Sequence, residues 1–351
     1  MNDKKIKVAI LGATGSVGQK FIELLTDHPW FIIHELAASD RSAGKKYSEA
    51  VNWVMQIPLR IDLAGKIVQK CEPTLESKIV FSALDANVAG TIEEEFARAG
   101  YVVISNARNH RFDEDVPLIV PEVNGDHLEM VKYQNYGNGA IVTNPNCSTI
   151  GLAMALKPLA DNFGVEAVNV VTMQAISGGG YPGVPSMDIL DNVIPFIGGE
   201  EEKMEKEPRK ILGLLRMNKI EYAQMTISAQ CNRVGVIDGH TECVQIKLKK
   251  RIAIEEIIKV WNNFSGEPQK LNLPSAPARP IIYLEGEKYP QPKMHRNLGN
   301  GMSVSIGRLR ECSLFDYKFV VLSHNTVRGA AGGTILIAEL MKAKGYLEKY
   351  L

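Results

Sequence analysis

The stretch KIKVAILGATGSVGQKFIELL, residues 5–25, decides the fold of the first half of the chain. Its first seven residues form an apolar run that is typical of a buried parallel strand. Gly12, Gly15 and Gly18 follow at intervals of three, and apolar residues in 21–25 then recur at helical spacing. A lone glycine turn is a weak signal. Directly after a strand and at the start of a helix it favours a dinucleotide site, because the backbone can approach a pyrophosphate and the helix N-terminus faces its charge.

Further strand and helix patterns follow along the first half. Apolar runs at residues 31–38, 78–84 and 101–106 are typical of buried strands, and a helix is expected near 92–99. Strands and helices that alternate with such short links predict a doubly wound, Rossmann-type parallel sheet in an α/β protein.

Loops at the carboxyl ends of these strands are candidate binding loops, because ligands bind at that edge of such sheets. Loops 82–85 and 105–111 fall there. Arg108 and Arg111 could each meet an anion, although arginines in loops more often face solvent. The residues alone do not choose between the two.

The loop SDRSAGKK, residues 39–46, bears on the choice of cofactor. Asp40 could accept hydrogen bonds from the ribose hydroxyls of NAD. Hydroxyl donors and positive charges surround it, from Ser39, Arg41, Ser42 and two lysines. Such a loop suits the 2′-phosphate of NADP better, although a solvated basic loop would have the same composition.

The stretch IVTNPNCSTI, residues 141–150, holds the candidate nucleophile. Pro145 cannot donate to a strand ladder, so the strand ends before it and a helix begins near Cys147. A thiol at a helix N-terminus loses its proton more readily, and the thiolate is the nucleophile. The alternative is that Cys147 is a small buried hydrophobe, which is what most free cysteines are.

The pattern changes after this helix and predicts a second, α+β domain. Residues 165–177 are β-rich, and alternation at 243–249 and 302–309 suits an antiparallel sheet with one buried face. Helical segments are expected near 201–215 and 254–264, a proline-rich extended connection at 274–292, and a final helix at 324–351 that returns to the first domain. The predicted domains are residues 1–146 plus 325–351 for the nucleotide and residues 147–324 for catalysis and dimerisation.

His240 and Arg233 are the candidate partners of the cysteine. Histidine titrates nearest neutral pH and is the natural acid or base, while the arginine fork recognises anions. Most histidines are structural, and the nearby arginine is what singles out His240. Glu200 and Lys203 lie one helical turn apart, which by itself indicates a solvated ion pair.

Composition excludes several function classes. Apolar residues make up 45% of the 351 residues, and 40 basic residues balance 40 acidic ones, so nothing favours nucleic acid or an anionic membrane. No apolar run approaches the length of a membrane span, and no signal segment is expected. Five scattered cysteines without a CxxC pair argue against disulfides and a structural zinc site. We expect a soluble cytoplasmic protein with no metal.

Seven segments in order resemble the aspartate-semialdehyde dehydrogenases, in particular their archaeal and fungal-type branch. They are GATGSVGQ, AASDRSAGKKY, DVPLIVPEVN, NPNCST, MQAISGGGYPG, NRVGVIDGHTE and HNTVRGAAGG. The resemblance covers nearly the whole chain, and NPNCST with the later NRV…GHTE is its specific part. It implies NADPH-dependent reduction of L-4-aspartyl phosphate to the semialdehyde and phosphate through a cysteine thioester, toward lysine, threonine and methionine.

The resemblance also implies the site residues. Cys147 would be the nucleophile, His240 the acid and base, and Gln174 and Asn146 members of the same pocket. Arg233 would hold the substrate carboxylate, Glu200 its amino group, and Lys203 and Arg111 the phosphate, although EEEK offers three possible glutamates. Cofactor contacts would come from Gly12, Thr14, Gly15, Ser16, Val17, Ser39, Arg41, Ser42, Ser82, Ser177, Gly178 and Asn325. A homodimer or homotetramer is expected.

Two other functions remain to be distinguished. A malonyl- or succinyl-CoA reductase on the same scaffold would share the thioester and NADPH, but a CoA thioester brings no amino group for Glu200 to bind. A nucleotide sensor without catalysis would keep the glycine turn and need neither Cys147 nor His240. N-acetylglutamyl-phosphate and glyceraldehyde-phosphate dehydrogenases share the architecture but fit the motifs less well.

Overall fold

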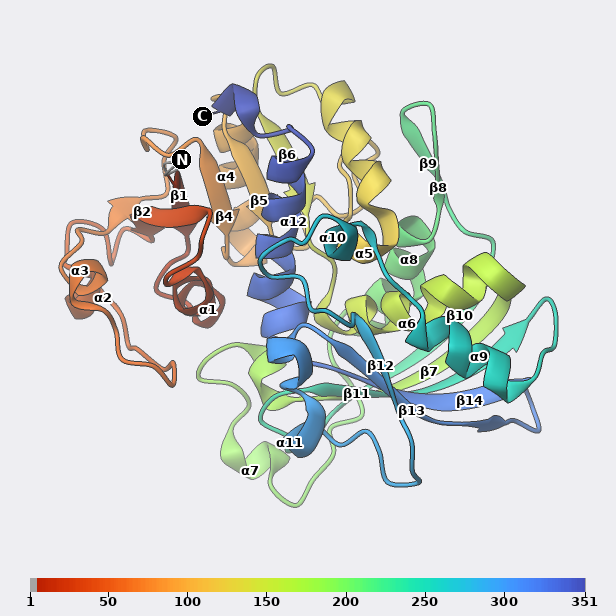
Figure 1. Ribbon diagram of the computed structural model, residues 1–351. Coiled ribbons are helices and arrows are strands. Elements are labelled where there is room, and N and C mark those ends of the chain that lie inside the picture. Colours follow the sequence, from red (N-terminus) through yellow and green to blue (C-terminus); the bar gives the residue numbers. More distant parts are fainter. Residues whose placement is uncertain (1–4, 351) are drawn as a thin grey trace. The chain divides into compact units, whose positions relative to one another are not determined.

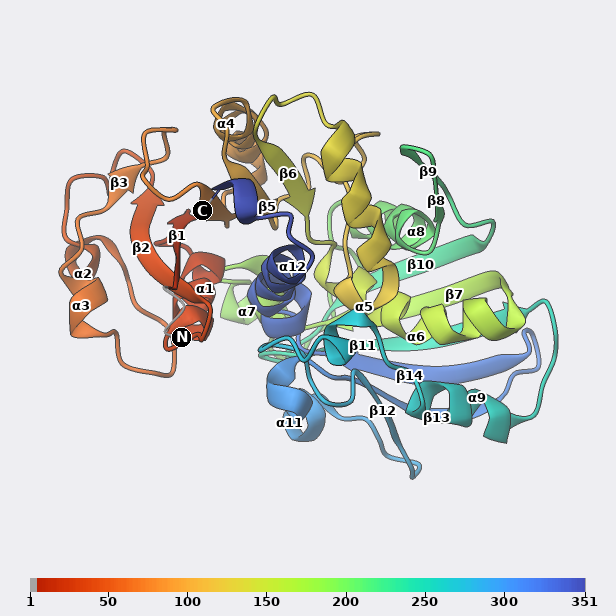
Figure 2. The ribbon, with the colours of Figure 1, turned by 45° about the horizontal axis from the view of Figure 1, so that its top comes forward.

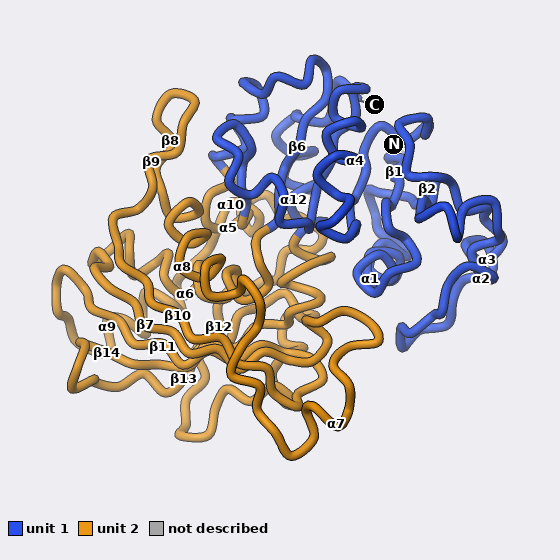
Figure 3. The backbone as a smooth tube through the Cα atoms, turned by 180° about the vertical axis from the view of Figure 1, so that it is seen from behind, with its two compact units in different colours: residues 1–119, 126–144, 334–351 blue, residues 120–125, 145–333 orange. Residues whose placement is uncertain are grey.

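The computed structural model describes residues 5–350 as two compact units, coloured separately in Figure 3. Of the described residues, the first unit comprises 5–119, 126–144 and 334–350, and the second comprises 120–125 and 145–333. The first junction falls close to the expected boundary at residue 146. The second differs, because residues 325–333 belong to the second unit.

The first unit is built on a parallel sheet of six strands, as expected. In spatial order these are β3 (Gln69–Lys70), β2 (Phe31–Ala38), β1 (Ile6–Leu11), β4 (Ile79–Ser82), β5 (Val102–Ser105) and β6 (Ala140–Thr143). Every residue of β4, β5 and β6 is buried, which explains why these strands are continuous apolar runs rather than alternating ones. The order, with β1 between β2 and β4, is that of a doubly wound nucleotide-binding sheet.

Helices connect these strands (Figure 1). They are α1 (Ser16–Leu25), α2 (Tyr47–Ala50), α3 (Ile61–Ala64), α4 (Ala86–Arg98) and the 3₁₀ segment η1 (Gly125–Tyr133), most of which belongs to this unit. α1 presents Phe21, Ile22 and Leu25 to the sheet, and Phe21 stacks on Phe81 with ring centroids 5.1 Å apart. This packing fixes the glycine turn at the carboxyl end of β1.

The expected final helix is shorter than residues 324–351. α12 spans Gly332–Ala343, a π-type turn η4 (Val327–Ala331) precedes it, and a 3₁₀ turn η5 (Glu348–Tyr350) follows. Ala330, at φ −144° and ψ −106°, breaks the helical geometry before α12. Gly345, at φ +77°, ends the helical continuation after it, because L-residues with side chains avoid that region.

The sheet of the second unit is mixed, so the expectation of an antiparallel sheet was wrong in part. Its spatial order is β10 (Thr226–Arg233), β7 (Val165–Gln174), β11 (His240–Leu248), β14 (Tyr317–Ser323), β13 (Val304–Glu311) and β12 (Ile281–Leu284). β10 runs parallel to β7 because a long crossover that contains α8 (Glu200–Ile211) joins them. The proline-rich connection also contains a strand: β12 pairs parallel with β13 at the sheet edge.

Helices cover one face of this sheet (Figure 2). α6 (Cys147–Phe163) lies over its centre, and α9 (Ile254–Asn262) buries Trp261, which donates to the Ala155 carbonyl and packs on Phe319. α8 covers the β10 edge. Its Glu201 and Glu205, one turn apart, accept from the backbone N–H groups of Cys231 and Ala229. An edge strand thereby gains partners that a neighbouring strand would otherwise supply.

The remaining elements are short. They are α5 (Pro121–Asn124), η2 (Ile176–Gly179), α7 (Ser186–Ile189), β8 (Leu214–Arg216), β9 (Lys219–Glu221), α10 (Glu267–Lys270), α11 (Pro292–His295) and η3 (Leu298–Gly301). Within residues 5–350, no helix combines the length and apolar character needed to cross a lipid bilayer.

Candidate active site

Asn146 caps the helix that carries the candidate nucleophile. Its side-chain oxygen accepts from the backbone N–H groups of Ser148 and Thr149, at 3.0 and 3.4 Å, and α6 begins at Cys147 as expected. These two N–H groups are therefore occupied. A hydrogen-bond donor that stabilises the thiolate of Cys147 therefore has to come from another residue.

That donor comes from His240. Its Nε2 lies 3.1 Å from Sγ of Cys147, and its Nδ1 accepts from the backbone N–H of Ala175 at 3.0 Å. A ring nitrogen that accepts carries no proton, so the proton of the neutral ring is on Nε2. His240 thus directs an N–H donor at the sulfur, and the backbone at the end of β7 selects that tautomer.

Burial keeps His240 neutral. The side chain is fully buried, and burial, with the nearby positive charge of Arg233, lowers its pKa to about 3. Gly178 closes over both side chains. A Cβ at this position would lie 2.8 Å from Nη1 of Arg233 and 3.2 Å from Nε2 of His240. Only glycine lets the loop backbone approach the pair this closely.

Arg233 stands at the end of β10 with one side of its guanidinium anchored. Nη1 donates to the carbonyl of Ala175 at 2.8 Å, and the side chain is buried. Burial lowers its pKa below the ordinary value. A buried guanidinium gains most from a bidentate carboxylate, which makes Arg233 suited to bind a substrate acid group.

Glu200 is the glutamate of the EEEK run that joins this cluster. It accepts from Nδ2 of Asn146 at 2.9 Å and from Nε2 of Gln174 at 3.1 Å, and it pairs with Lys203. Burial by itself would raise the Glu200 pKa, but the Lys203 charge and these hydrogen bonds hold it below its ordinary value. Glu201 is bonded to the β10 edge, and Glu202 pairs with Lys206 at the surface.

Glu207 is a site residue that the sequence analysis missed. It is fully buried on α8, and its Oε2 accepts from the backbone N–H of Asn146 at 2.7 Å. Two turns separate it from Glu200, and both bond to Asn146. Their seven-residue spacing on one helix was the available signal.

Asn325 joins two further parts of the second unit. Its Nδ2 donates to Oγ of Ser177 and its Oδ1 accepts from the backbone N–H of Gly239, both at 2.8 Å. Since Gly239 precedes His240 and Ser177 precedes Gly178, Asn325 ties together the two segments that flank the imidazole. Its predicted place beside a nicotinamide stays a prediction.

The glycine turn of the first unit has the geometry that a pyrophosphate needs. Gly12 has φ +76°, and a Cβ there would lie 2.5 Å from the Ala83 carbonyl oxygen. Gly18 packs directly on the Gly12 backbone. Gly15 occupies the N-cap of α1 and has no side chain to take up the first N–H groups, which leaves them for an anion. The predicted contacts Thr14, Ser16 and Val17 are partly exposed in this turn.

The other predicted residues of the first unit are placed as follows. Ser39 and Arg41 are exposed after β2, and Ser42 is partly exposed. The Ser82 hydroxyl is fully buried and donates to Glu93, so a cofactor contact from Ser82 would have to use its backbone. Arg111 is buried and donates to the Asn106 carbonyl at 2.8 Å. Its role as a phosphate ligand stays a prediction.

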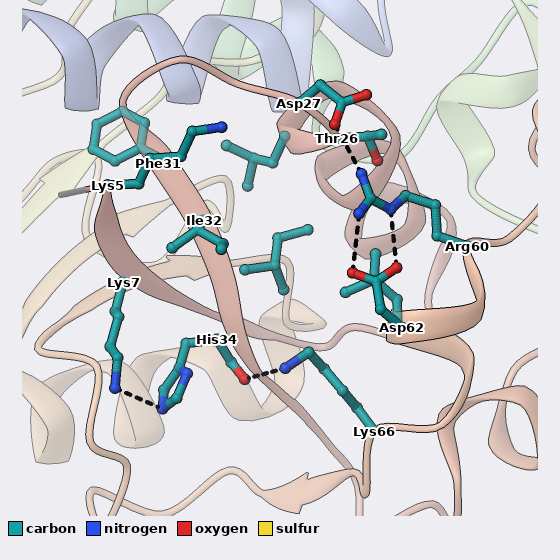
Figure 4. A pocket seen from close by; sticks show the side chains of 13 residues that line it. Lys5, Lys7, Thr26, Asp27, Phe31, Ile32, His34, Arg60, Asp62 and Lys66 are labelled. Carbon is teal, nitrogen blue, oxygen red and sulfur yellow. Dashed lines mark hydrogen bonds and ion pairs between the residues drawn. The ribbon is translucent and has the colours of Figure 1, made fainter. Parts of the chain in front are cut away.

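A separate pocket of about 530 Å³ lies at the opposite end of the β1 and β2 strands from the glycine turn (Figure 4). Several polar groups of its lining are engaged within the protein: Arg60 bonds to Asp27 and Asp62, and Lys66 donates to the His34 carbonyl. It contains none of the predicted site residues.

Comparisons with known proteins show what the chain as a whole is similar to. The profile "Semialdehyde dehydrogenase, NAD binding domain" matches residues 7–131, and "Semialdehyde dehydrogenase, dimerisation domain" matches residues 156–328. Aspartate-semialdehyde dehydrogenase of Archaeoglobus fulgidus is 50% identical over 96% of this chain and 98% of its own. That of Schizosaccharomyces pombe is 51% identical over 97% and 99%.

The chain belongs to the aspartate-semialdehyde dehydrogenase family.

A solved structure supports this assignment. The crystal structure of aspartate semialdehyde dehydrogenase with NADP from Candida albicans superposes with a TM-score of 0.91 at 47% identity, covering 97% of this chain and 99% of the other. The resemblance inferred from the motifs and the two-part α/β fold are thereby confirmed. The individual residue roles are not tested by these comparisons and remain predictions.

Proposed function

We propose that this chain catalyses the NADPH-dependent reduction of L-4-aspartyl phosphate to L-aspartate 4-semialdehyde and phosphate, in the biosynthesis of lysine, threonine and methionine. The observation that carries the proposal is the cluster around Cys147 in the second unit: a thiol–imidazole pair, a buried arginine and an ionised glutamate. A small acyl phosphate with one carboxylate and one ammonium group complements these charges.

Attack by Cys147 opens the reaction. The thiolate, which accepts from Nε2–H of His240, attacks the acyl carbon, the carbon–oxygen bond to phosphate breaks, and a thioester remains. Bound NADPH would supply the hydride that reduces this thioester. His240 keeps its Nε2 proton throughout and donates a hydrogen bond to the tetrahedral oxyanion that follows. Collapse of that oxyanion releases the aldehyde and returns the thiolate.

The charged residues of the site would orient the substrate. Arg233 would grip the α-carboxylate, while Glu200 would accept from the ammonium group, with Asn146 and Gln174 holding Glu200 in place. Lys203 and Arg111 would bind the phosphate. For NADP, the Gly12–Gly18 turn fits the pyrophosphate, and Arg41 with Ser39 and Ser42 would meet the 2′-phosphate.

The chain would act as a homodimer or homotetramer. The match to a dimerisation domain supports this, as does an apolar surface on residues 181–196. Tyr181, Met187, Leu190, Val193 and Phe196 are all more than half exposed there. Light scattering should give at least twice the 38.7 kDa chain mass. The cysteines of the described residues form no disulfide bond, which is compatible with a reducing compartment, and we infer the cytoplasm.

A direct assay tests the activity. NADP reduction with aspartate semialdehyde should depend on added phosphate and be absent in Cys147→Ser. NADPH oxidation with malonyl-CoA should be negligible, because a CoA thioester leaves Glu200 without an amino group. Faster turnover of malonyl-CoA than of aspartate semialdehyde would contradict the proposal. The similar proteins quoted above are all aspartate-semialdehyde dehydrogenases and do not favour the CoA alternative.

A further inference from the structure

A buried ion pair lies beside the candidate nucleophile. Arg328 of η4 donates from Nη1 to Oε1 of Glu122 at 2.8 Å and from Nη2 to Oε2 at 2.5 Å. Both side chains are almost completely buried. Nη2 also lies 3.5 Å from Sδ of Met154 on α6, the helix that begins at Cys147. The guanidinium is thus held between α5 and α6, next to the reaction machinery but outside it.

Both ends of this pair are closely packed. A Cβ at position 266 would lie 2.5 Å from the Cα atom of Glu122, so the backbone of Gly266 presses on the glutamate. Nε of Arg328 has no hydrogen-bond partner among the residues that the structure describes. A buried ion pair of this kind adds little net stability compared with apolar side chains of the same shape, but it accepts only one geometry.

The residue after Arg328 touches the nucleophile. A Cβ on Gly329 would lie 2.7 Å from Cβ and 2.9 Å from Cα of Cys147, so the Gly329 backbone rests directly on the cysteine. The Gly329 N–H donates to the carbonyl of His324 at 2.9 Å, which closes the turn. The ion pair holds one side of η4, and the other side packs on Cys147.

We propose that Arg328 and Glu122 form a positioning pair, which presses the Gly329 backbone against Cys147 and so fixes the direction of Sγ toward Nε2 of His240. The inference rests on the proposed role of Cys147 as the nucleophile. Neither member of the pair touches substrate or cofactor in this scheme. The pair acts through the backbone of η4, whose π-type geometry and non-helical Ala330 differ from those of an ordinary helical turn.

The test uses the alkylation rate of Cys147 by iodoacetamide, read by mass spectrometry on the NPNCST peptide, together with steady-state turnover. Arg328→Met should slow both, with kcat falling on the order of 10- to 100-fold, because small misplacements of a reacting group have effects of this size. The KM for NADP should stay within about twofold. Alkylation should also require a higher pH, since Sγ loses its fixed N–H donor.

A double variant separates positioning from stability. Glu122→Leu with Arg328→Met replaces the pair by apolar side chains and removes the unpaired charge, so it should fold at least as well as the single variant. We expect its alkylation and turnover to remain slow. Recovery of both to wild-type rates would overturn the proposal, because the pair would then serve stability alone. Gly329→Ala, which keeps the pair, should slow alkylation by pushing directly on Cys147.

The matched control is Glu339→Gln, which disrupts another buried pair, between Glu339 and His28 in the first unit. It should lower stability without changing the rate or pH dependence of Cys147 alkylation. If iodoacetamide alkylates Cys147 in Arg328→Met at the wild-type rate, the inference fails while the proposed function stands. If wild-type Cys147 forms no acyl adduct with aspartyl phosphate, it is the proposed function that fails.

Discussion

Nε2 of His240 lies 3.1 Å from Sγ of Cys147, while the opposite ring nitrogen accepts from the backbone N–H of Ala175. The imidazole therefore holds a donor toward the sulfur before any substrate binds. A base poised to take the thiol proton would need the other tautomer. The geometry instead favours a histidine that stabilises successive anions, first at sulfur and then at oxygen.

Substitution of Cys147 and substitution of His240 should have different effects on the reaction. Cys147→Ser should abolish turnover, because a hydroxyl is a far weaker nucleophile than a thiolate. His240→Ala should leave an enzyme that is still acylated but is slower by roughly 10²- to 10³-fold, because one hydrogen-bond donor to the oxyanion is lost. Mass spectrometry after mixing with aspartyl phosphate, without NADPH, should show an adduct on wild type and His240→Ala only. An adduct on the peptide around Cys231 would show that the nucleophile has been misassigned.

The low pKa of His240 predicts an effect on stability. The unfolded chain binds a proton there near pH 6.5, whereas the folded pKa is about 3. The unfolded state therefore holds more protons between these values, and stability falls as the pH falls through that window. From pH 7 to pH 5 the free energy of unfolding should drop by about 2 kcal/mol more in wild type than in His240→Gln. Urea unfolding at both pH values measures this, and equal drops would show that His240 titrates normally.

Several site residues could be predicted from sequence because each stands in a distinctive local pattern. Cys147 follows a strand-ending proline at the start of a helix, and His240 was singled out by Arg233, seven residues before it. The tautomer of His240 could not be predicted, because it depends on where the backbone of Ala175 lies after β7. The capping of α6 by Asn146 also depends on three-dimensional geometry, although asparagine before a helix is a signal for it.

The fold, too, was predictable in part: some of its features follow from local sequence patterns, and others depend on three-dimensional connections. Apolar runs and glycine spacing predicted the parallel sheet of the first unit, where burial on both faces leaves little ambiguity. Alternation at residues 243–249 correctly indicated a strand with antiparallel neighbours, whereas the parallel pairings of β10 with β7 and of β12 with β13 were not predicted. Strand direction in the second sheet follows from the crossover connections. A helix near residues 201–215 was expected, but the sequence did not indicate that the crossover containing it would make β10 run parallel to β7.

Arg41 is expected to select the cofactor. It is exposed after β2, whose carboxyl end pairs in parallel with that of β1, where the glycine turn begins. Its guanidinium is the charged group of this loop best suited to a 2′-phosphate. Arg41→Ala should weaken NADP binding tenfold or more, since a charge-assisted contact contributes about 1.5 to 3 kcal/mol. NAD binding should hardly change. Titration calorimetry with both cofactors measures this, and equal losses would place the 2′-phosphate elsewhere.

Arg233→Lys tests substrate recognition. Lysine keeps the charge but cannot donate to Ala175 and grip a carboxylate with a planar fork at the same time. The KM for aspartate semialdehyde should rise and kcat should fall, with NADP affinity unchanged. Wild-type kinetics in Arg233→Lys would mean that another residue binds the carboxylate.

Asn146 makes two different interactions, and substitutions can test each of them separately. Its side-chain oxygen caps α6, and its amide donates to Glu200. Asn146→Ser keeps a capping oxygen but loses the bridge to Glu200, so its stability should stay near wild type while turnover falls. Asn146→Ala loses both, and its free energy of unfolding should fall by about a further 1 kcal/mol.

Asn146→Asp makes the third member of this series, because a carboxylate caps a helix well but repels Glu200 at short range. Its α6 should remain capped, whereas Glu200 should bind a substrate ammonium poorly. We therefore expect a larger rise in the KM for aspartate semialdehyde in Asn146→Asp than in Asn146→Ser, with thermal stability highest in Ser and lowest in Ala. Turnover that simply follows stability across the three variants would show that Asn146 acts only as a cap, and Glu200 would then lose its proposed place at the substrate amino group.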